Sequence, residues 1–157
     1  MLTPSAIPAD LTNRQRGQID GASLAGYMGE LFPAEFHDPN VALIGLTPLD
    51  LYAADENWRF ELAAADWSGP SHGVVSSYRM YWAMSGLAND QLVLLRTRKM
   101  VTKYIGLMYY RLPLSDDPTS PMYGHIMAVS DLDNMQEPLP ILRQRPRVAI
   151  GALQMLA

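Results

Sequence analysis

The chain has 157 residues, of which 48% are apolar and 18% are charged, and its net charge is -4 at neutral pH. This length and composition are typical of one globular domain and exclude a disordered chain. The acidic balance provides no field that would recruit nucleic acid or an acidic membrane surface, and the absence of cysteine excludes disulfides, thiolate nucleophiles and sulfur-ligated zinc.

The first ten residues contain two prolines and predict an extended lead-in. They have neither the basic region nor the long apolar run of a secretory signal. No stretch reaches the run of about 18 apolar residues that a membrane span needs. We therefore expect a cytoplasmic protein that does not bind membranes.

The first half of the chain predicts one helix and three strands. Asp10 or Thr12 could cap a helix that runs to about Leu31. The unbroken apolar run at residues 41–46 predicts a strand buried on both faces. Thr47 and Pro48 then predict the cap and first position of a helical turn, with Asp50 near its N-terminus. Two further strands are predicted at residues 58–62 and 73–80.

The second half is dominated by a long helix, predicted from Asn89 or Asp90 to about Tyr110. Its predicted buried stripe has helical spacing and consists of Leu94, Thr97, Val101, Tyr104, Ile105 and Met108. A short helix is predicted to open at residues 130–133 and to end before Pro138. We therefore expect one domain at residues 1–137, followed by a tail at 138–157 whose structure and role the sequence leaves open.

Three segments together resemble a known family. Residues 43–52 look like the "GLT-x-x-DLY" strand and turn of archaemetzincin-like zinc peptidases. Residues 57–60 and 73–80 look like the next two strands, and residues 98–102 enter a long helix as the active-site helix of that family does. The resemblance covers roughly residues 40 to 135. It implies a zincin-like α/β (α+β) fold with a mixed twisted sheet, a long former active-site helix and a small C-terminal lobe.

The family motif H-E-x-x-H-x-x-G-x-x-H would follow on that helix, but its functional residues are absent here. Two histidines at i and i+4 would hold zinc, the glutamate would polarise the metal-bound water, and the glycine would let a third histidine close the site. The corresponding positions are Lys103, Tyr104, Leu107, Tyr110 and Pro113. Met122 lies where the family places its Met-turn. No residue of this motif can bind zinc, so we expect neither a metal nor another cofactor.

The histidines and acidic residues elsewhere in the chain allow a second hypothesis, a metal site outside the motif. His37, His72 and His125 have no local ligand spacing, and we expect surface or loop histidines. The aspartates at positions 116, 117, 131 and 133 could form a hard-cation site, but turn and helix-cap roles are favoured. A peptidase with relocated ligands, drawn from His72 or His125 and these aspartates, stays open.

The vacated motif also suggests a ligand pocket. Its candidate residues are Lys103, Tyr104, Tyr109, Arg111 and Tyr123, which could bind an anionic or peptide ligand. In this pocket Lys103 would pair with a carboxylate such as Asp116 or Glu61. The basic run Arg96, Arg98, Lys99 and Lys103 is interpreted as a solvated helix face. The arginines at positions 143, 145 and 147 could contact a partner.

The resulting hypothesis is a catalytically inactive relative of the metallopeptidases. It would act as a binding or structural module, with an unknown protein or peptide partner or with further copies of itself. The rival hypothesis is an enzyme, either a zinc peptidase with relocated site residues or another hydrolase that uses the tyrosine–lysine pocket.

Overall fold

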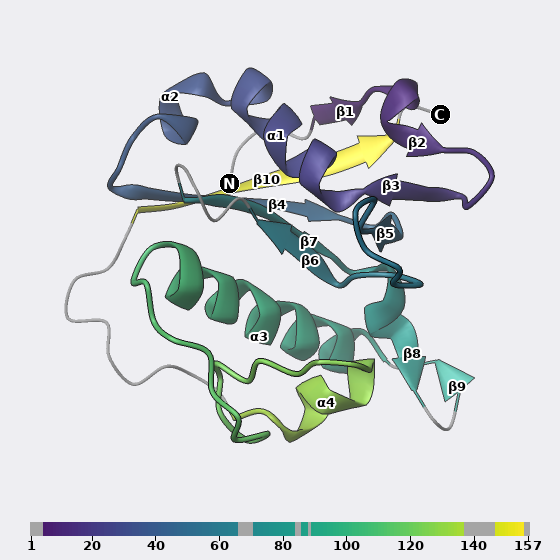
Figure 1. Cartoon of the computed structure of the whole chain (residues 1–157), viewed down its shortest axis with the longest axis vertical. Helices are drawn as coiled ribbons and strands as arrows, with labels where there is room; N and C mark the ends of the chain where they lie inside the picture. The colour runs from purple at the N-terminus through teal and green to yellow at the C-terminus, as the bar shows by residue number, and fades with distance from the viewer. Residues whose placement is uncertain (1–4, 66–70, 84–85, 88, 137–146, 156–157) are drawn as a thin grey trace.

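A five-stranded mixed sheet forms the centre of a computed structural model that describes residues 5–65, 71–83, 86–87, 89–136 and 147–155 (Figure 1). In spatial order its strands are β1 (Ser5–Ile7), β10 (Arg147–Met155), β4 (Val41–Thr47), β7 (His72–Ser76) and β6 (Ala63–Ala65). The first four strands run parallel, and β6 is antiparallel to β7. The predicted mixed sheet is confirmed.

Helices cover both faces of this sheet (Figure 1). Helices α1 (Gly21–Leu31) and α2 (Pro33–Phe36) lie on one face. Helix α3 (Asp90–Met108) crosses the other face, and the short α4 (Val129–Asn134) lies beyond it. A hydrophobic cluster fills each interface. Among the described residues, no helix is long and apolar enough to cross a membrane.

Smaller elements complete the fold. The strands β2 (Thr12–Asn13), β3 (Gln18–Asp20) and β5 (Leu51–Tyr52) form a second sheet, and β8 (Trp82–Ala83) pairs with β9 (Gly86–Leu87). Two 3-10 turns occur, η1 (Ala9–Leu11) and η2 (Tyr78–Tyr81).

Strand β4 is buried on both faces, as its unbroken apolar run predicts. Leu43 belongs to the cluster under α1, whereas Ile44 belongs to the cluster under α3. Gly45 allows the first of these layers to close, because a Cβ atom there would lie 2.7 Å from both Met28 Sδ and Leu153 Cδ1. A central position in the sheet therefore accounts for the composition of this strand.

Several predicted elements of the first half are wrong in position. The first helix begins at Gly21 instead of Asp10 or Thr12, because Asp20 accepts the Ser23 N–H at 2.9 Å and caps it there. The preceding residues turn back at Gly17, whose φ of 65° is a conformation that glycine adopts without strain.

The two segments after β4 also differ from the prediction. No helical turn follows Thr47, whose hydroxyl accepts the Leu49 N–H at 3.3 Å, and the chain continues directly into β5. In place of a strand at 58–62, residues 63–65 form β6 and Glu61 makes only a bridge to Leu51. The strand predicted at 73–80 ends at Ser76 and gives way to η2.

Strand β10, near the C-terminus, lies between β1 and β4 in the main sheet. Strand β10 pairs in parallel with β4 from Arg147 to Ala152 and with β1 through residues 153–155. The pairing with β4 joins segments more than a hundred positions apart in the sequence, and no local pattern indicates it. The predicted contact residues Arg143 and Arg145 lie outside the described residues.

Candidate functional site

The predicted motif positions fall in the C-terminal half of α3 and in the loop between α3 and α4. The predicted bounds of α3 are confirmed, and Asn89 caps the helix by accepting the Leu92 N–H at 2.9 Å. The predicted stripe is wrong at Leu94, whose side chain is 66% exposed.

Three of the four basic residues of α3 are buried, which contradicts their interpretation as a solvated face, whereas Arg98 is exposed as predicted. Arg96, Lys99 and Lys103 are 2%, 7% and 6% exposed. Their spacing of i, i+3 and i+7 places all three on one side of the helix. A buried cation is tolerated only where it finds strong acceptors. The acceptors here come mainly from α4 and the preceding loop.

Arg96 has the most complete set of partners. Its Nε and Nη2 donate to the two carboxylate oxygens of Asp133 at 2.7 and 2.6 Å. Its Nη1 donates to the carbonyl oxygens of Met80 and Trp82 at 2.7 and 2.6 Å. The guanidinium therefore joins α3 to α4 and to the end of η2.

The two lysines bind backbone carbonyls. The Lys99 ammonium donates to the Leu132 carbonyl oxygen in α4 at 2.7 Å. The Lys103 ammonium donates to the Tyr123 carbonyl oxygen at 2.5 Å. The predicted pairing of Lys103 with Asp116 or Glu61 is not formed, since Asp116 pairs with His125 and Glu61 lies beside Gly21. Burial lowers the pKa of Lys103 from 10.5 to about 8.

Tyr104 lies next to Lys103 in the sequence but points toward the sheet. Its hydroxyl donates to the Ala63 carbonyl oxygen of β6 at 2.8 Å. Burial, with a smaller contribution from the negative charge of Glu61, raises the pKa of Tyr104 well above its ordinary value. Lys103 and Tyr104 therefore do not converge on one pocket.

The remaining motif positions are dispersed. Leu107 is buried, whereas Pro113 is exposed. The ring of Tyr110 packs edge-on against Tyr109 with a centroid distance of 5.0 Å. Met122 is buried in the loop that carries Tyr123. The left-handed residue after α3 is Arg111, with φ of 52°, rather than Tyr110 at the position of the motif glycine.

The three histidines do not meet. His125 is exposed in the loop, and its Nε2 lies 2.9 Å from Asp116 Oδ1. His72 is buried in β7, which contradicts its interpretation as a surface or loop residue. Its ring packs on Phe36 with a centroid distance of 4.3 Å, and the ring of His37 lies edge-on to Phe36 with a centroid distance of 5.2 Å.

The other aspartates serve turns, a cap and an ion pair. Asp117 accepts the Thr119 N–H and hydroxyl, each at 2.8 Å, and these hydrogen bonds lower the pKa of Asp117. Asp131 accepts the N–H groups of Met127 and Ala128 at 2.8 and 2.9 Å, at the start of α4. The predicted turn and cap roles are confirmed for these two residues.

These residues do not fit a zinc ion. A catalytic zinc site needs about three nitrogen or oxygen lone-pair donors. Lys103 presents protons, Leu107 an aliphatic group and Pro113 an exposed ring without a donor. Within the part of the chain that the structure describes, no group of three or more histidine, aspartate or glutamate side chains could hold a metal ion.

Two solved structures are similar to this arrangement of elements. The crystal structure of archaemetzincin from Methanopyrus kandleri has a TM-score of 0.63 and 22% identity, and the match covers 83% of this chain and 64% of that one. The crystal structure of a zinc-dependent peptidase from Methanocorpusculum labreanum has a TM-score of 0.62 and 22% identity, and it covers 83% of this chain and 74% of that one. The fold is archaemetzincin-like. The predicted zincin-like α/β fold is thereby confirmed.

The chain spans 64% of the length of the Methanopyrus kandleri archaemetzincin. No protein-family model matches its sequence, and no curated protein matches it. The similarity to archaemetzincin is therefore a similarity of fold.

Sequence reasoning missed a buried network on this archaemetzincin-like fold. Asp50 is 8% exposed and binds Arg79 through both oxygens, at 2.7 and 2.6 Å. Gln18 donates to the same carboxylate at 2.8 Å. The Arg79 guanidinium lies over the rings of Phe60 and Trp82, 4.1 and 4.5 Å from their centroids. Asp50 therefore joins β3 to η2 through Gln18 and Arg79. The predicted role at the N-terminus of a helical turn is wrong.

Glu61, which we expected only as a possible partner of Lys103, is a second polar group with a buried oxygen. Its Oε1 is buried and makes no hydrogen bond to any described residue. Desolvation and the charges of Asp20 and Asp55 raise the pKa of Glu61 to about 7, and a hydrogen bond from the Gly21 backbone acts in the opposite direction. A Cβ atom at Gly21 would lie 2.0 Å from this oxygen, so the glycine makes room for the carboxylate.

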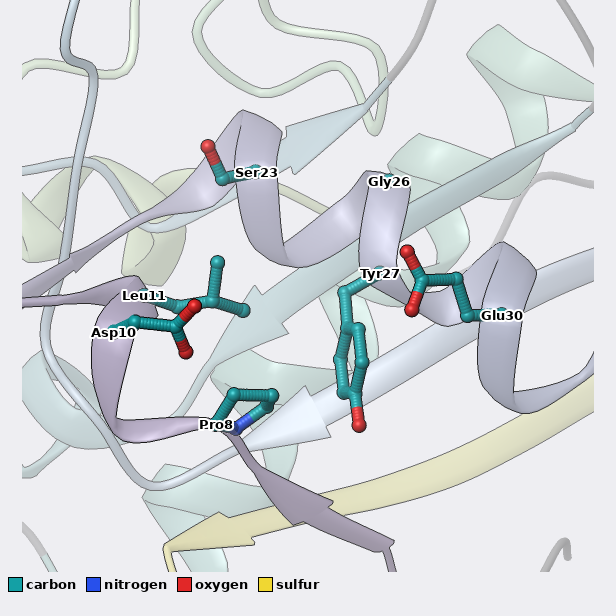
Figure 2. Close-up of a pocket in the computed structure, with 7 residues that line it drawn as sticks. All are labelled: Pro8, Asp10, Leu11, Ser23, Gly26, Tyr27 and Glu30. Atoms are coloured by element: carbon teal, nitrogen blue, oxygen red, sulfur yellow. The ribbon is translucent and has the colours of Figure 1, made fainter.

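A hollow of about 390 Å³ lies between α1 and the segment at residues 8–11 (Figure 2). Tyr27 reaches across it toward Pro8, and Asp10 and Glu30 stand at its rim. Its other lining residues are Leu11, Ser23 and Gly26. None of the predicted site residues contributes to it.

Proposed function

We propose that this chain is a catalytically inactive protein of archaemetzincin-like fold that acts as a binding or structural module. The observation that carries the proposal is the position of Lys103. Its ammonium is buried and donates to the Tyr123 carbonyl oxygen. A protonated amine in that bond repels a divalent cation and offers it no lone pair.

The neighbouring motif positions support the same conclusion. The Tyr104 hydroxyl is committed to Ala63 in the sheet, where it cannot polarise a water molecule next to Lys103. Leu107 contributes an aliphatic group to the buried side of α3. The helix that would carry a metal site is instead used to attach α4 and the preceding loop to the domain.

A binding role rests on the part of the predicted pocket that stays at the surface. Arg111 is exposed, and Tyr109 and Tyr123 are half-buried on the same loop. A guanidinium and tyrosine rings suit an anionic or peptide ligand. Lys103 and Tyr104 are used in internal hydrogen bonds and are not part of this surface.

The rival enzyme hypothesis has one supporting observation, the exposed pair of His125 and Asp116. A histidine held by a carboxylate can act as a general base. The ring of Tyr123 lies edge-on to His125 at a centroid distance of 5.9 Å. Two such groups do not by themselves provide a nucleophile or a metal site.

Incubation of the untagged protein with a diverse peptide mixture and added zinc tests the proposal. Cleavage products are followed by mass spectrometry for the native chain and for His125→Ala. We expect no products from either protein. Products from the native chain that disappear both with His125→Ala and with a chelator would establish the enzyme instead. Asn40→Ala, a change in an exposed turn, controls for contaminating peptidases.

A further inference from the structure

The loop between α3 and α4, residues 109–128, contains no helix and no strand of more than one bridge. Its only regular pairing is the bridge between Ser115 and Tyr123. The Ser115 N–H donates to the Met122 carbonyl at 3.0 Å, and the Gly124 N–H donates to the Ser115 carbonyl at 2.9 Å. These bonds close residues 115–124 into a compact unit, which we call the flap. The Lys103 ammonium binds it at Tyr123.

Both ends of the loop are held more firmly than the flap. On one side, the Leu112 N–H donates to the Gly106 carbonyl at 3.0 Å and anchors the chain to the end of α3. On the other side, α4 is fixed by Arg96 and Lys99 and buries Val129 and Leu132. The flap itself is held by the buried Met122, by partly buried Tyr123 packed against the cluster under α3, and by the Gln136 N–H, which donates to the Thr119 carbonyl at 2.8 Å. Opening of the flap would break the Lys103–Tyr123 bond and the packing of Met122 and Tyr123, whereas the bonds of Arg96 and Lys99 to α4 involve no flap residue.

Within the part of the chain that the structure describes, the Lys103 ammonium binds the Tyr123 carbonyl and no carboxylate. The charged groups of the elements around it are engaged elsewhere. Arg96 pairs with Asp133, Lys99 binds the Leu132 carbonyl, Asp116 pairs with His125, Asp117 binds Thr119, and Asp131 caps α4. An ammonium buried against a single carbonyl is less stable than one in water. Closing the flap over Lys103 therefore opposes its protonation.

We propose that the flap is a pH-responsive cover that closes more tightly on α3 when Lys103 loses its proton. An open flap hydrates the ammonium, whereas a closed flap removes its water. The closed state consequently binds the proton more weakly, and raising the pH favours closure. The pKa of Lys103 is lowered from 10.5, the ordinary value for lysine, to about 8 by burial. The effect on flap closure is therefore expected between pH 8 and pH 10.5. The inference holds whether or not the chain is an enzyme.

Hydrogen exchange followed by mass spectrometry at pH 7 and pH 10 tests the proposal, with each rate divided by the intrinsic rate at that pH. For the native chain we expect protection of the flap to increase roughly tenfold or more between these values, while protection of α4 and β4 stays constant. Lys103→Met has no proton to lose, and Lys103→Arg keeps its proton throughout this range. Both variants should therefore show flap protection that does not change with pH.

Lys99→Met is the matched control, because Lys99 lies on the same face of α3 but binds α4. It should lower protection of α4 and leave the pH response of the flap intact. The proposal is overturned if flap protection in the native chain is constant or falls at high pH, or if Lys103→Arg keeps the native response. If Lys103→Met does not fold, the pH dependence of flap protection in the native chain and in Lys103→Arg is sufficient to test the proposal.

Discussion

Arg96 and Asp133 join α3 to α4 through two parallel hydrogen bonds of 2.7 and 2.6 Å. The Arg96 side chain is 3% exposed, while the Asp133 side chain is 37% exposed. Removing the carboxylate leaves a buried cation with carbonyl partners alone. The pair therefore explains how a run of basic residues can lie inside the protein.

Asp133→Asn should lower the free energy of unfolding by about 2 kcal/mol, somewhat less than for a fully buried pair because Asp133 is partly hydrated. Urea denaturation measures the change. Asp116→Asn is the matched control, since the same substitution there breaks an ion pair with His125 that is fully at the surface. We expect no measurable effect from the control. Equal effects of the two substitutions would contradict the structural role assigned to Arg96.

Glu61→Gln should stabilise the protein at pH 8 but not at pH 4. The pKa of Glu61 is raised to about 7 from 4.5, so the folded state binds the proton more strongly than the unfolded state does. Stability associated with this carboxyl is therefore present at low pH and is lost as the pH rises from 4.5 to 7. Glutamine carries no charge at any of these values.

The gain at pH 8 should be about 1 kcal/mol, after allowance for the partial exposure of Glu61. Urea denaturation at the two pH values measures it. Glu56→Gln, an exposed change on the same connection, is the control. A gain of equal size at both pH values would show that desolvation of the charge is not the cause.

Arg111→Gly should raise the free energy of unfolding by about 0.5–1 kcal/mol, because a non-glycine residue in the left-handed region is strained. Arg111 has φ of 52° after the end of α3. Tyr110→Gly should instead destabilise the protein, since Tyr110 has no positive φ and packs against Tyr109. Thermal denaturation of the two variants compares them. Stabilisation by the Tyr110 substitution would place the strained turn at the position of the motif glycine after all.

The sequence predicts the fold best where local pattern and burial agree. The apolar run of β4 and the Asn89 cap of α3 each identify their element within a residue or two. The start of α1 was missed because both Asp20 and the earlier polar residues are good caps, and the turn at Gly17 decides between them. The place of β10 between β1 and β4 was missed because pairing between distant strands leaves no local pattern in the sequence.

The sequence identified the residues at the motif positions, but it did not show which side chains point into the protein and which point to solvent. The substitution of motif ligands by Lys103 and Leu107 can be read directly from the chain. The burial of Arg96 and Lys99 cannot, because the groups that neutralise or bind them lie 37 and 33 positions later. Helical periodicity alone therefore assigned the polar residues to the outside and Leu94 to the inside.

The zinc content of protein purified without a histidine tag tests the central claim most directly. The protein is equilibrated with zinc, dialysed and analysed by mass spectrometry of the elements, and its melting temperature is recorded with and without a chelator. Because the Lys103 ammonium occupies the position of a ligand, we expect far less than stoichiometric zinc and an unchanged melting temperature. Stoichiometric zinc that survives dialysis and raises the melting temperature would contradict the account.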